Sequence, residues 1–513
     1  MFHLNAPYKP AWDQPKAIKE ILQNFEKGQD KVVLLGATWT GKTFTMANII
    51  NKLNLPTLVL SHNKTLAAQL TTEFKWFFPD NAVNYFVSYF DYYQPESYIP
   101  ERDIYIEKDS SINNEIEMYR LAAMSNLLTR QDTIIVSSVS AIYGLGTAEL
   151  FIESSLTFEV WKEYDFRQIK EKLLNMQYNP VKWDIAPGTF NFLGNMLDIY
   201  SSVEDVVYRI HFDEEEVVFI EKKDPIRWER IWTASKITIW PATQFMQNMD
   251  NLDQILAEIK KELDLRVKYF KKREELLFAQ RIQQRVEYDI KMIKETGFVN
   301  WIENYSRYFE RRLPAQPPQS LFDYFPDEFL LIIDESHMTI PQFQAMPAAD
   351  KSRKLNLINY GFRLPSALDH RPLFWQELEY ILGLQDLPKD LKDKTISKSP
   401  NLQNLPESPN LLDLYKEIIQ IESNLLDNQL DFNFQLEPVL KALNKSKKKK
   451  VYVLFVSATP AEYEIKISNN TIVEQIIRPT GLLDPITYIY PKSWDYDILE
   501  KSLEALEKKN EKK

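Results

Sequence analysis

One eight-residue segment has the spacing of a phosphate-binding loop. Gly36-Ala37-Thr38-Trp39-Thr40-Gly41-Lys42-Thr43 matches the pattern of two glycines followed by a lysine and a hydroxyl residue. In such a loop the backbone N–H groups wrap the phosphates, Lys42 meets the outer phosphate charge, and the Thr43 hydroxyl holds Mg²⁺. An apolar run precedes the loop and a helical stretch follows it, which a chance Gly-Lys-Thr turn would not require. The pattern predicts a site for ATP and Mg²⁺.

An acidic pair follows a second apolar run, Phe329–Ile333. We expect Asp334 to reach Mg²⁺ through water and Glu335 to polarise the attacking water, as an ATPase requires. Acidic residues can also cap strands without any catalytic role, so the pair gains its meaning from the loop. After a third apolar run, Val451–Val456, the sequence Ser457-Ala458-Thr459 resembles a helicase motif that couples nucleotide state to movement, although by itself it is a weak signal.

The segment from Tyr89 to Tyr105 is rich in aromatic residues that could stack on DNA bases. Aromatic side chains on a projecting ribbon can stack on bases or separate two strands without any sequence preference. A buried core strand would not tolerate Pro95, Pro100 and the charges between them. The candidate DNA-binding residues are Tyr89, Phe90, Tyr92, Tyr93, Tyr98 and Tyr105, of which the first two could instead pack at the base of the ribbon.

The elements that must position these residues change in character along the chain. Residues 1–150 alternate apolar runs with helical stretches, which predicts a parallel α/β sheet. Residues 151–245 indicate a small α+β insert, and residues 246–374 a helical region followed by a return to the sheet at Asp334. Residues 375–450 form a low-complexity insertion rich in Leu, Asn, Ser and Lys. Residues 451–513 hold the Ser-Ala-Thr strand and the start of a truncated second helicase domain, with a charged tail.

The composition narrows the function further. The net charge of -11 argues against a generally adhesive nucleic-acid binder, so any DNA site must be a local basic or aromatic feature. The absence of cysteine excludes disulfides and thiolate metal sites. The sequence has neither an apolar signal core nor a run long enough to span a membrane, and we expect a cytoplasmic protein.

Together these segments resemble the family of excinuclease B subunits, UvrABC system protein B. The resemblance covers about residues 1–374 and 451–495. It rests on the phosphate loop, the aromatic hairpin and blocks whose order and spacing agree: Ala11–Pro15, Asn63–Gln69, Ile142–Gly146, Ile302–Arg307, Asp334–His337, Tyr360–Asp369 and Glu474–Asp484.

The resemblance implies a RecA-like P-loop NTPase sheet of helicase superfamily 2, carrying helical and α+β insert domains and an aromatic β-hairpin at 89–112. It implies damage recognition and verification in nucleotide excision repair, with the hairpin inserted between the strands of damaged double-stranded DNA. The A subunit (UvrA) would dock on residues 151–245, and the C subunit (UvrC) would follow. Gln14 matches the position that reads adenine.

Two other functions stay open. The chain could be a different superfamily-2 DNA translocase, although such a motor would lack the proline-bounded aromatic wedge. It could also be a non-catalytic module that only binds the A subunit. Because the sequence ends soon after Asp484, we expect a truncated second helicase domain, weakened C-subunit contacts and impaired ATP hydrolysis, since that domain supplies a transition-state arginine. The insertion 375–450 replaces a short connection of the family and has no assigned role.

Tryptophan stands where the family pattern has glycine at seven positions. Glycine and tryptophan each occur 11 times, and this is a low glycine count for 513 residues. An indole is sterically poor inside a loop that must curl around phosphate. We therefore expect that the gene uses the codon UGA for glycine and that the printed sequence shows it as tryptophan at Trp12, Trp39, Trp161, Trp228, Trp232, Trp301 and Trp494.

Overall fold

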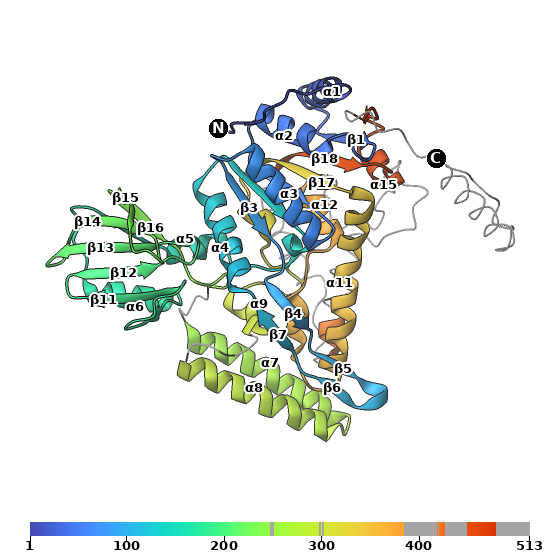
Figure 1. Cartoon of the computed structure of the whole chain (residues 1–513). Coiled ribbons are helices and arrows are strands. Elements are labelled where there is room, and N and C mark those ends of the chain that lie inside the picture. Colours follow the sequence, from blue (N-terminus) through green and yellow to red (C-terminus); the bar gives the residue numbers. More distant parts are fainter. Residues whose placement is uncertain are drawn as a thin grey trace, which may run out of the picture.

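Seven apolar runs form one parallel sheet in the order β19-β1-β18-β17-β2-β8-β3 (Figure 1). The computed structural model describes residues 1–246, 251–296, 299, 302–383, 418, 420–425 and 449–478. The strands are β1 (Lys31–Gly36), β2 (Thr57–Leu60), β3 (Ala82–Phe86), β8 (Thr133–Ser137), β17 (Glu328–Asp334), β18 (Lys450–Ser457) and β19 (Ile472–Gln475). Alternate residues of β17 enter opposite hydrophobic cores, so both faces of the sheet are buried. The predicted α/β fold is confirmed.

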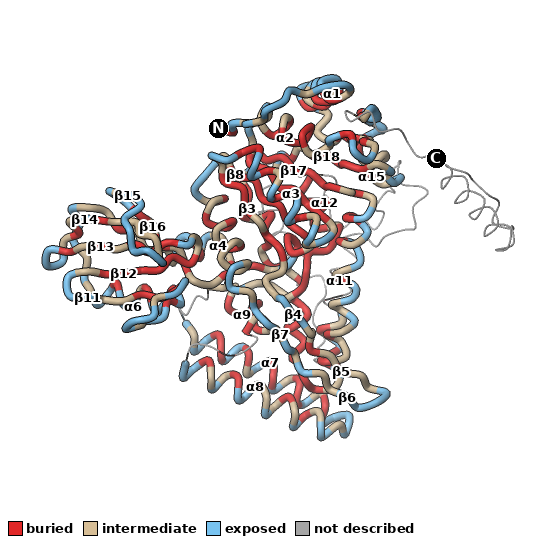
Figure 2. The backbone as a smooth tube through the Cα atoms, viewed as in Figure 1, coloured by how far each residue is buried: buried red, intermediate tan, exposed pale blue. Residues whose placement is uncertain are grey.

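Helices cover both faces of this sheet. On one face lie α1 (Gln14–Glu26), α2 (Lys42–Leu53) and α3 (Lys64–Phe77). On the other face lie α4 (Asn114–Thr129), α11 (Ser336–Asn359) and α12 (Trp375–Ile381), with three shorter helices: α5 (Ala148–Ser154), α10 (Leu321–Tyr324) and η2 (Val139–Ile142). Figure 2 shows the buried residues concentrated between these layers. In the part of the chain that the structure describes, no helix is long and apolar enough to cross a membrane.

The Ser-Ala-Thr strand belongs to this first sheet. From the sequence, this strand is expected to belong, within 451–513, to the start of a second helicase domain. In the structure β18 lies between β1 and β17, and β19 extends the sheet on the far side of β1. Between these two parallel neighbours, β18 buries its apolar side chains on both faces of the sheet. The described end of the chain therefore completes the first sheet, and residues 479–513 lie outside the described residues.

The predicted 151–245 unit is a separate α+β unit from residue 156 onward, at the left of Figure 1, whereas residues 151–154 belong to α5 and pack on the first sheet. A six-stranded sheet and a two-stranded ribbon enclose their own hydrophobic core beside one helix. The elements are β9 (Leu156–Glu159), α6 (Phe166–Asn175), β10 (Asn179–Pro180), β11 (Thr189–Leu193), β12 (Met196–Tyr200), β13 (Val207–Asp213), β14 (Glu216–Lys223), β15 (Arg230–Ala234) and β16 (Lys236–Ile239). This stretch thus has a hydrophobic core of its own.

The helix-periodic stretch after residue 250 forms two packed helices, α7 (Leu252–Lys272) and α8 (Leu276–Thr296). The turn between them includes Glu274, whose φ of 62° is incompatible with an α-helix. η3 (Ile302–Tyr305) and α9 (Ser306–Phe309) complete the core of this helical unit. Most of the insertion 375–450 lies outside the described residues, but Leu425 is buried against Ile358 and Leu368 beside this unit.

Candidate nucleotide and DNA sites

The predicted phosphate loop connects the end of β1 to the start of α2, so its amides lie at a helix N-terminus. Gly41 has a φ of +77°, and a Cβ there would lie 2.6 Å from Nε2 of Gln14. A Cβ on Gly36 would meet the Lys42 side chain at the same distance. The positive φ therefore favours glycine at position 41, and a Cβ at position 36 would force the Lys42 side chain to move.

The lysine and the acidic pair meet at this loop. Nζ of Lys42 lies 3.1 Å from the Gly36 carbonyl and 3.5 Å from Oε1 of Glu335. Asp334 ends β17 and is 5% exposed; burial, reinforced by the charge of Glu335, raises its pKa to about 7. The structure thus brings the predicted Mg²⁺ carboxylate and the water-polarising Glu335 to the loop that contains Thr43.

The Asp-Glu-Ser-His segment also contacts the Ser-Ala-Thr segment. Nδ1 of His337 lies 2.8 Å from Oγ of Ser457, and His337 lies 3.6 Å from the Glu335 carboxylate. Glu335 itself adopts a left-handed φ of 42°, a strained conformation for a residue with a side chain. His337 therefore lies between the acidic pair and the neighbouring strand β18, and it is hydrogen-bonded to Ser457 of that strand.

Two polar residues at this site were missed by the sequence reasoning. Gln475 donates from Nε2 to the Thr40 carbonyl at 2.8 Å, and Arg478 donates from Nε to the Thr38 carbonyl at 2.8 Å. Gln14, the predicted adenine reader, also donates to Thr40, at 3.0 Å. Gln475 and Arg478 occur in the block that begins at Glu474, but nothing local indicates a contact with a loop more than 430 residues away.

The predicted aromatic hairpin is present as two short ribbons in series. At its base β4 (Phe90–Gln94) pairs with β7 (Asp109–Ile112), and toward its tip β5 (Ser97–Ile99) pairs with β6 (Ile104–Ile106), which is closed by η1 (Pro100–Arg102). Its edges carry two exposed aromatics, Tyr92 (50% exposed) and Tyr93 (46% exposed). These two side chains are available to a base.

The remaining aromatics of the hairpin pack inward. Tyr89 and Phe90 are half-buried at the base, with ring centroids 4.3 Å apart. Tyr98 is buried, and Tyr105 stacks on the Phe362 ring at 4.5 Å. Tyr98 and Tyr105 therefore cannot stack on DNA in this conformation, because the hairpin tip uses them to pack against the end of α11.

Buried ion pairs hold the hairpin to the rest of the molecule. Oε2 of Glu96 lies 2.7 Å from Nε of Arg363, and Oε1 lies 3.2 Å from Arg285. Burial alone would raise the pKa of Glu96, but the two arginines outweigh it and hold this pKa below its ordinary value. At the base, Lys108 of the hairpin pairs with Glu303 of the helical unit at 2.8 Å. The hairpin is thus tied to the helical unit at both ends.

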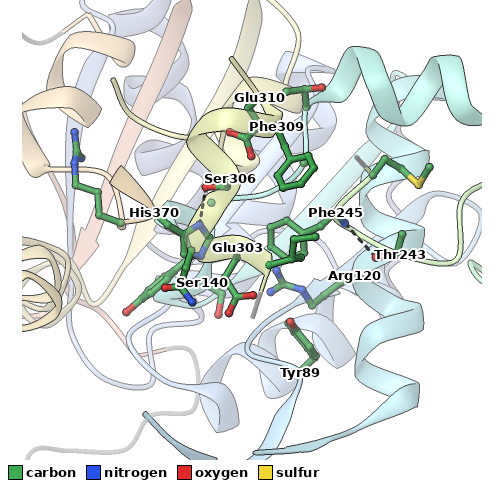
Figure 3. A pocket seen from close by; sticks show the side chains of 18 of the residues that line it. Tyr89, Arg120, Ser140, Thr243, Phe245, Glu303, Ser306, Phe309, Glu310 and His370 are labelled. Carbon is green, nitrogen blue, oxygen red and sulfur yellow. Dashed lines mark hydrogen bonds between the residues drawn. The ribbon is translucent and has the colours of Figure 1, made fainter. Parts of the chain in front are cut away.

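A cavity of about 1400 Å³ is lined in part by residues of the hairpin, and Figure 3 shows side chains of its lining from close by. Its walls come from the hairpin, α11, the 151–245 unit and the helical unit, with Tyr89, Phe245 and Phe309 directed toward it. The lining has eight basic side chains (Lys108, Arg120, Lys172, Arg311, Arg353, Lys354, Arg363 and Arg371) and six acidic ones (Glu96, Glu149, Glu153, Glu303, Glu310 and Asp350). The lining thus has two more basic than acidic side chains, and Lys108, Arg353, Lys354 and Arg363 are each paired with a carboxylate. A local basic and aromatic DNA site stays a prediction here.

Four of the seven tryptophans flagged above adopt a glycine-like backbone. Trp12, Trp39, Trp161 and Trp228 have φ values of 56°, 69°, 68° and 58°. Only a few per cent of residues other than glycine adopt such angles, and bulky ones are genuine outliers. Trp232 lies in β15 opposite Lys222 without a positive φ, and Trp301 and Trp494 lie outside the described residues.

Each of the three structural units matches a protein-family model. Residues 8–137 match the family model "Type III restriction enzyme, res subunit", residues 156–245 match "UvrB interaction domain", and residues 250–311 match "UvrB third helical domain". The first model agrees with the helicase-like sheet, and the other two coincide with the two inserted units. The helicase-like sheet therefore has the architecture of a nucleotide-binding domain.

The chain is also similar over almost its whole length to curated relatives. It is 43% identical over 492 residues to UvrABC system protein B of Francisella tularensis, covering 96% of this chain and 63% of that protein. It is 41% identical over 508 residues to UvrABC system protein B of Cytophaga hutchinsonii and 41% over 502 residues to that of Microcystis aeruginosa, covering 99% and 97% of this chain and 65% and 64% of those proteins. The chain thus spans slightly less than two thirds of these relatives. On this evidence, the chain belongs to the family of UvrABC system protein B.

Proposed function

We propose that this chain is the ATP-binding, damage-recognition part of a nucleotide excision repair excinuclease. One observation carries the proposal: a hairpin with exposed aromatics at its base covers a basic and aromatic cavity, and it stands on the same sheet as a nucleotide site. A strand of DNA has negative phosphates and flat bases, and the cavity and the hairpin match these two properties. A general translocase needs the nucleotide site but not the wedge.

In the proposed mechanism, one DNA strand passes behind the hairpin while Tyr92 and Tyr93 stack on bases at the point where the strands separate. The basic side chains of the cavity face its phosphates. A bulky lesion cannot pass between the hairpin and the cavity wall, so it stops there. Stacking contributes about 1–3 kcal/mol per base for any sequence, which suits a protein that must inspect every sequence for damage.

The nucleotide is proposed to be ATP with Mg²⁺. The residues of the site fit this group, because the loop lies at a helix N-terminus and has no room for a Cβ at Gly36 or Gly41. Lys42 would exchange its present contacts for the outer phosphates, Thr43 and Asp334 would hold Mg²⁺, and Gln14 would read adenine. When bound, the nucleotide supplies a phosphoanhydride bond whose cleavage Glu335 would assist by orienting water.

The helix α11 offers a route between the two sites. It begins beside Glu335 and ends at Asn359, and at about 1.5 Å per residue its 24 residues span about 36 Å. Near its C-terminal end Arg353 donates to the Glu96 carbonyl at 2.8 Å, and Leu357 packs against Tyr98. We propose that α11 transmits nucleotide state to the hairpin tip.

The 151–245 unit is proposed to dock the A subunit, which would load the chain onto damaged double-stranded DNA before the C subunit acts. This unit has its own core, so it can present a surface without deforming the sheet. DNA-stimulated phosphate release separates this function from a non-catalytic module. Normal A-subunit binding with no release at all would favour the module.

The central test replaces Tyr92 and Tyr93 by Ala and measures affinity for damaged duplex in the presence of the A subunit. Loss of two stacking side chains should weaken binding at least tenfold. Tyr288→Ala is the matched control, because Tyr288 is 61% exposed on α8 and does not line the cavity. Unchanged affinity in the double variant would refute the proposed wedge.

A further inference from the structure

The clamp segment, Gln475–Arg478, surrounds the outer side of the phosphate loop. The backbone carbonyl of Gln475 accepts from the Ala37 amide at 3.1 Å. Its side chain accepts from the Thr45 hydroxyl at 2.8 Å and donates to the Thr40 carbonyl at 2.8 Å. Gln475 is fully buried, so these contacts are shielded from water.

The rest of the clamp segment is held by the residue that precedes α1. Oδ2 of Asp13 accepts from the amides of Ile476 and Ile477, at 2.9 and 2.8 Å. This positions Arg478 to donate to the Thr38 carbonyl at 2.8 Å. The next residue after Asp13, Gln14, reaches the same Thr40 carbonyl as Gln475 does. Both segments therefore donate to the Thr40 carbonyl, and the clamp segment also donates to the Thr38 carbonyl.

Holding these carbonyls determines where the amides point. A peptide group is planar and trans, so the N–H of each following residue points away from the carbonyl that is held. With the carbonyls of Thr38 and Thr40 fixed on the outer side, the N–H groups of Trp39 and Gly41 face the inner side of the loop. An anion binds to a phosphate loop through such inward amides. Without outer donors the peptide groups could rotate, and the amides would have to be reoriented on each binding event.

We propose that Gln475 and Arg478 are positioning residues that pre-orient the amides of the phosphate loop for the nucleotide. The inference rests on the proposed nucleotide function and deepens it, because it assigns a role to residues that touch only the loop. By linkage, a nucleotide that uses the oriented loop also stabilises the clamp segment. The amides of Ile476 and Ile477 therefore exchange with solvent more slowly when nucleotide is bound.

The test compares Gln475→Met with Gln29→Met by calorimetric titration of Mg²⁺–ADP into the whole chain. Gln29 is the matched control: it donates from Nε2 to the Ser468 carbonyl at 3.0 Å, beside the same sheet edge but away from the loop. Methionine keeps the length of the side chain without burying a charge, and Thr45 can instead bond a carbonyl of its own helix. We expect Gln475→Met to weaken binding about tenfold, a loss typical of one hydrogen bond, and Gln29→Met to leave binding unchanged.

Hydrogen exchange of residues 472–478, with and without Mg²⁺–ADP, supplies a readout that a merely structural role would not change. Slower exchange with nucleotide in the wild type, and no such slowing in Gln475→Met, supports the proposal. The positioning role is refuted if Gln475→Met and the wild type bind Mg²⁺–ADP equally well, or if nucleotide does not change the exchange rates. Either result leaves the proposed nucleotide site intact. If the wild type itself does not bind Mg²⁺–ADP, the proposed function fails as well, so the two failures are distinguishable.

Discussion

The residue at position 39 stands where the phosphate loop must turn back on itself, and its φ of 69° is one that glycine adopts freely. The exposed indole, 72% accessible, gains no packing that would offset a cost of roughly 1–2 kcal/mol for a left-handed residue with a Cβ. Trp12, Trp161 and Trp228 share this backbone conformation. We propose that the protein made in its own cell carries glycine at these four positions.

Mass spectrometry of the protein from its native source should find glycine at position 39, and a peptide with tryptophan there would contradict the proposal. A stability test is independent of the source. Replacing the four left-handed tryptophans by glycine should raise the free energy of unfolding by several kcal/mol. The control is Trp183→Gly, because Trp183 is 89% exposed without a positive φ, and there the change should slightly destabilise the fold.

The raised pKa of Asp334 predicts the pH dependence of metal binding. Burial and the neighbouring Glu335 raise this pKa to about 7, so the carboxyl must lose a proton near neutral pH before it holds Mg²⁺. Mg²⁺-dependent nucleotide affinity should therefore fall about tenfold per pH unit below 7. Measuring that affinity between pH 5.5 and 8.5 checks this, and a flat profile would contradict it.

The same pKa predicts a stability effect of opposite sign. The folded pKa lies above the unfolded one, so the contribution of Asp334 to stability is full at low pH and lost as pH rises through 7. Asp334→Asn should thus stabilise the nucleotide-free chain more at pH 8 than at pH 5, while it removes the Mg²⁺ dependence. Thermal unfolding at the two pH values measures the difference.

At the scale of elements, the sequence predicted the parallel sheet, its loop and the existence of the aromatic hairpin, because strand, turn and helix patterns are local. It did not predict which aromatics face solvent. Tyr92 and Tyr98 look alike in sequence, but only Tyr98 meets Tyr360 and Phe362, whose rings lie 4.8 and 4.9 Å away. These partners are more than 250 residues distant, so no local pattern could separate the two tyrosines. The contact of Gln475 with the phosphate loop could not be predicted for the same reason.

The hairpin tip should detach when the charge of Glu96 is removed. Glu96→Gln keeps the shape of the side chain but removes the counter-charge of the half-buried Arg285 and of the buried Arg363, and at the buried Arg363 this costs roughly 3–5 kcal/mol. We expect amide exchange in residues 97–106 to accelerate at least tenfold, and binding of damaged duplex to weaken. Glu101→Gln, an exposed change on the same tip, should alter neither quantity.

The ion pairs of Glu96 in the wild type should also weaken in acid. The pKa of Glu96 is held below its ordinary value, so its contribution to stability is present above the unfolded pKa and is lost as pH falls through the folded pKa. Exchange in residues 97–106 of the wild type at low pH should then approach that of Glu96→Gln. Slow exchange in residues 97–106 that persists unchanged in acid would mean that Tyr98 and Tyr105 hold the tip by packing alone.

At the scale of the whole molecule, one buried charge cluster joins the helical unit to the segment Pro365–Asp369 and to the inserted stretch. NH1 of Arg307 lies 2.7 Å from Asp369 and 2.9 Å from Glu422, the latter on a short described helix of the inserted stretch. Burial opposes ionisation of Glu422, and the nearby charge of Asp369 raises its pKa further, although Arg307 lowers it. A single arginine thus joins two carboxylates from segments that are far apart in the sequence.

Removing that arginine should loosen the helical unit from these two segments. Arg307→Met leaves Asp369 and Glu422 buried without their cation, and breaking such a pair costs roughly 3–5 kcal/mol. Because the hairpin is tied to the helical unit through Lys108 and Glu303, we expect a separate early transition in calorimetric unfolding, together with faster exchange at the hairpin base. Lys260→Met breaks an exposed pair with Glu287 on α7 and α8 and should change stability by less than about 1 kcal/mol. A single cooperative transition for Arg307→Met, at the wild-type temperature, would show that apolar packing rather than this cluster holds the two segments to the helical unit.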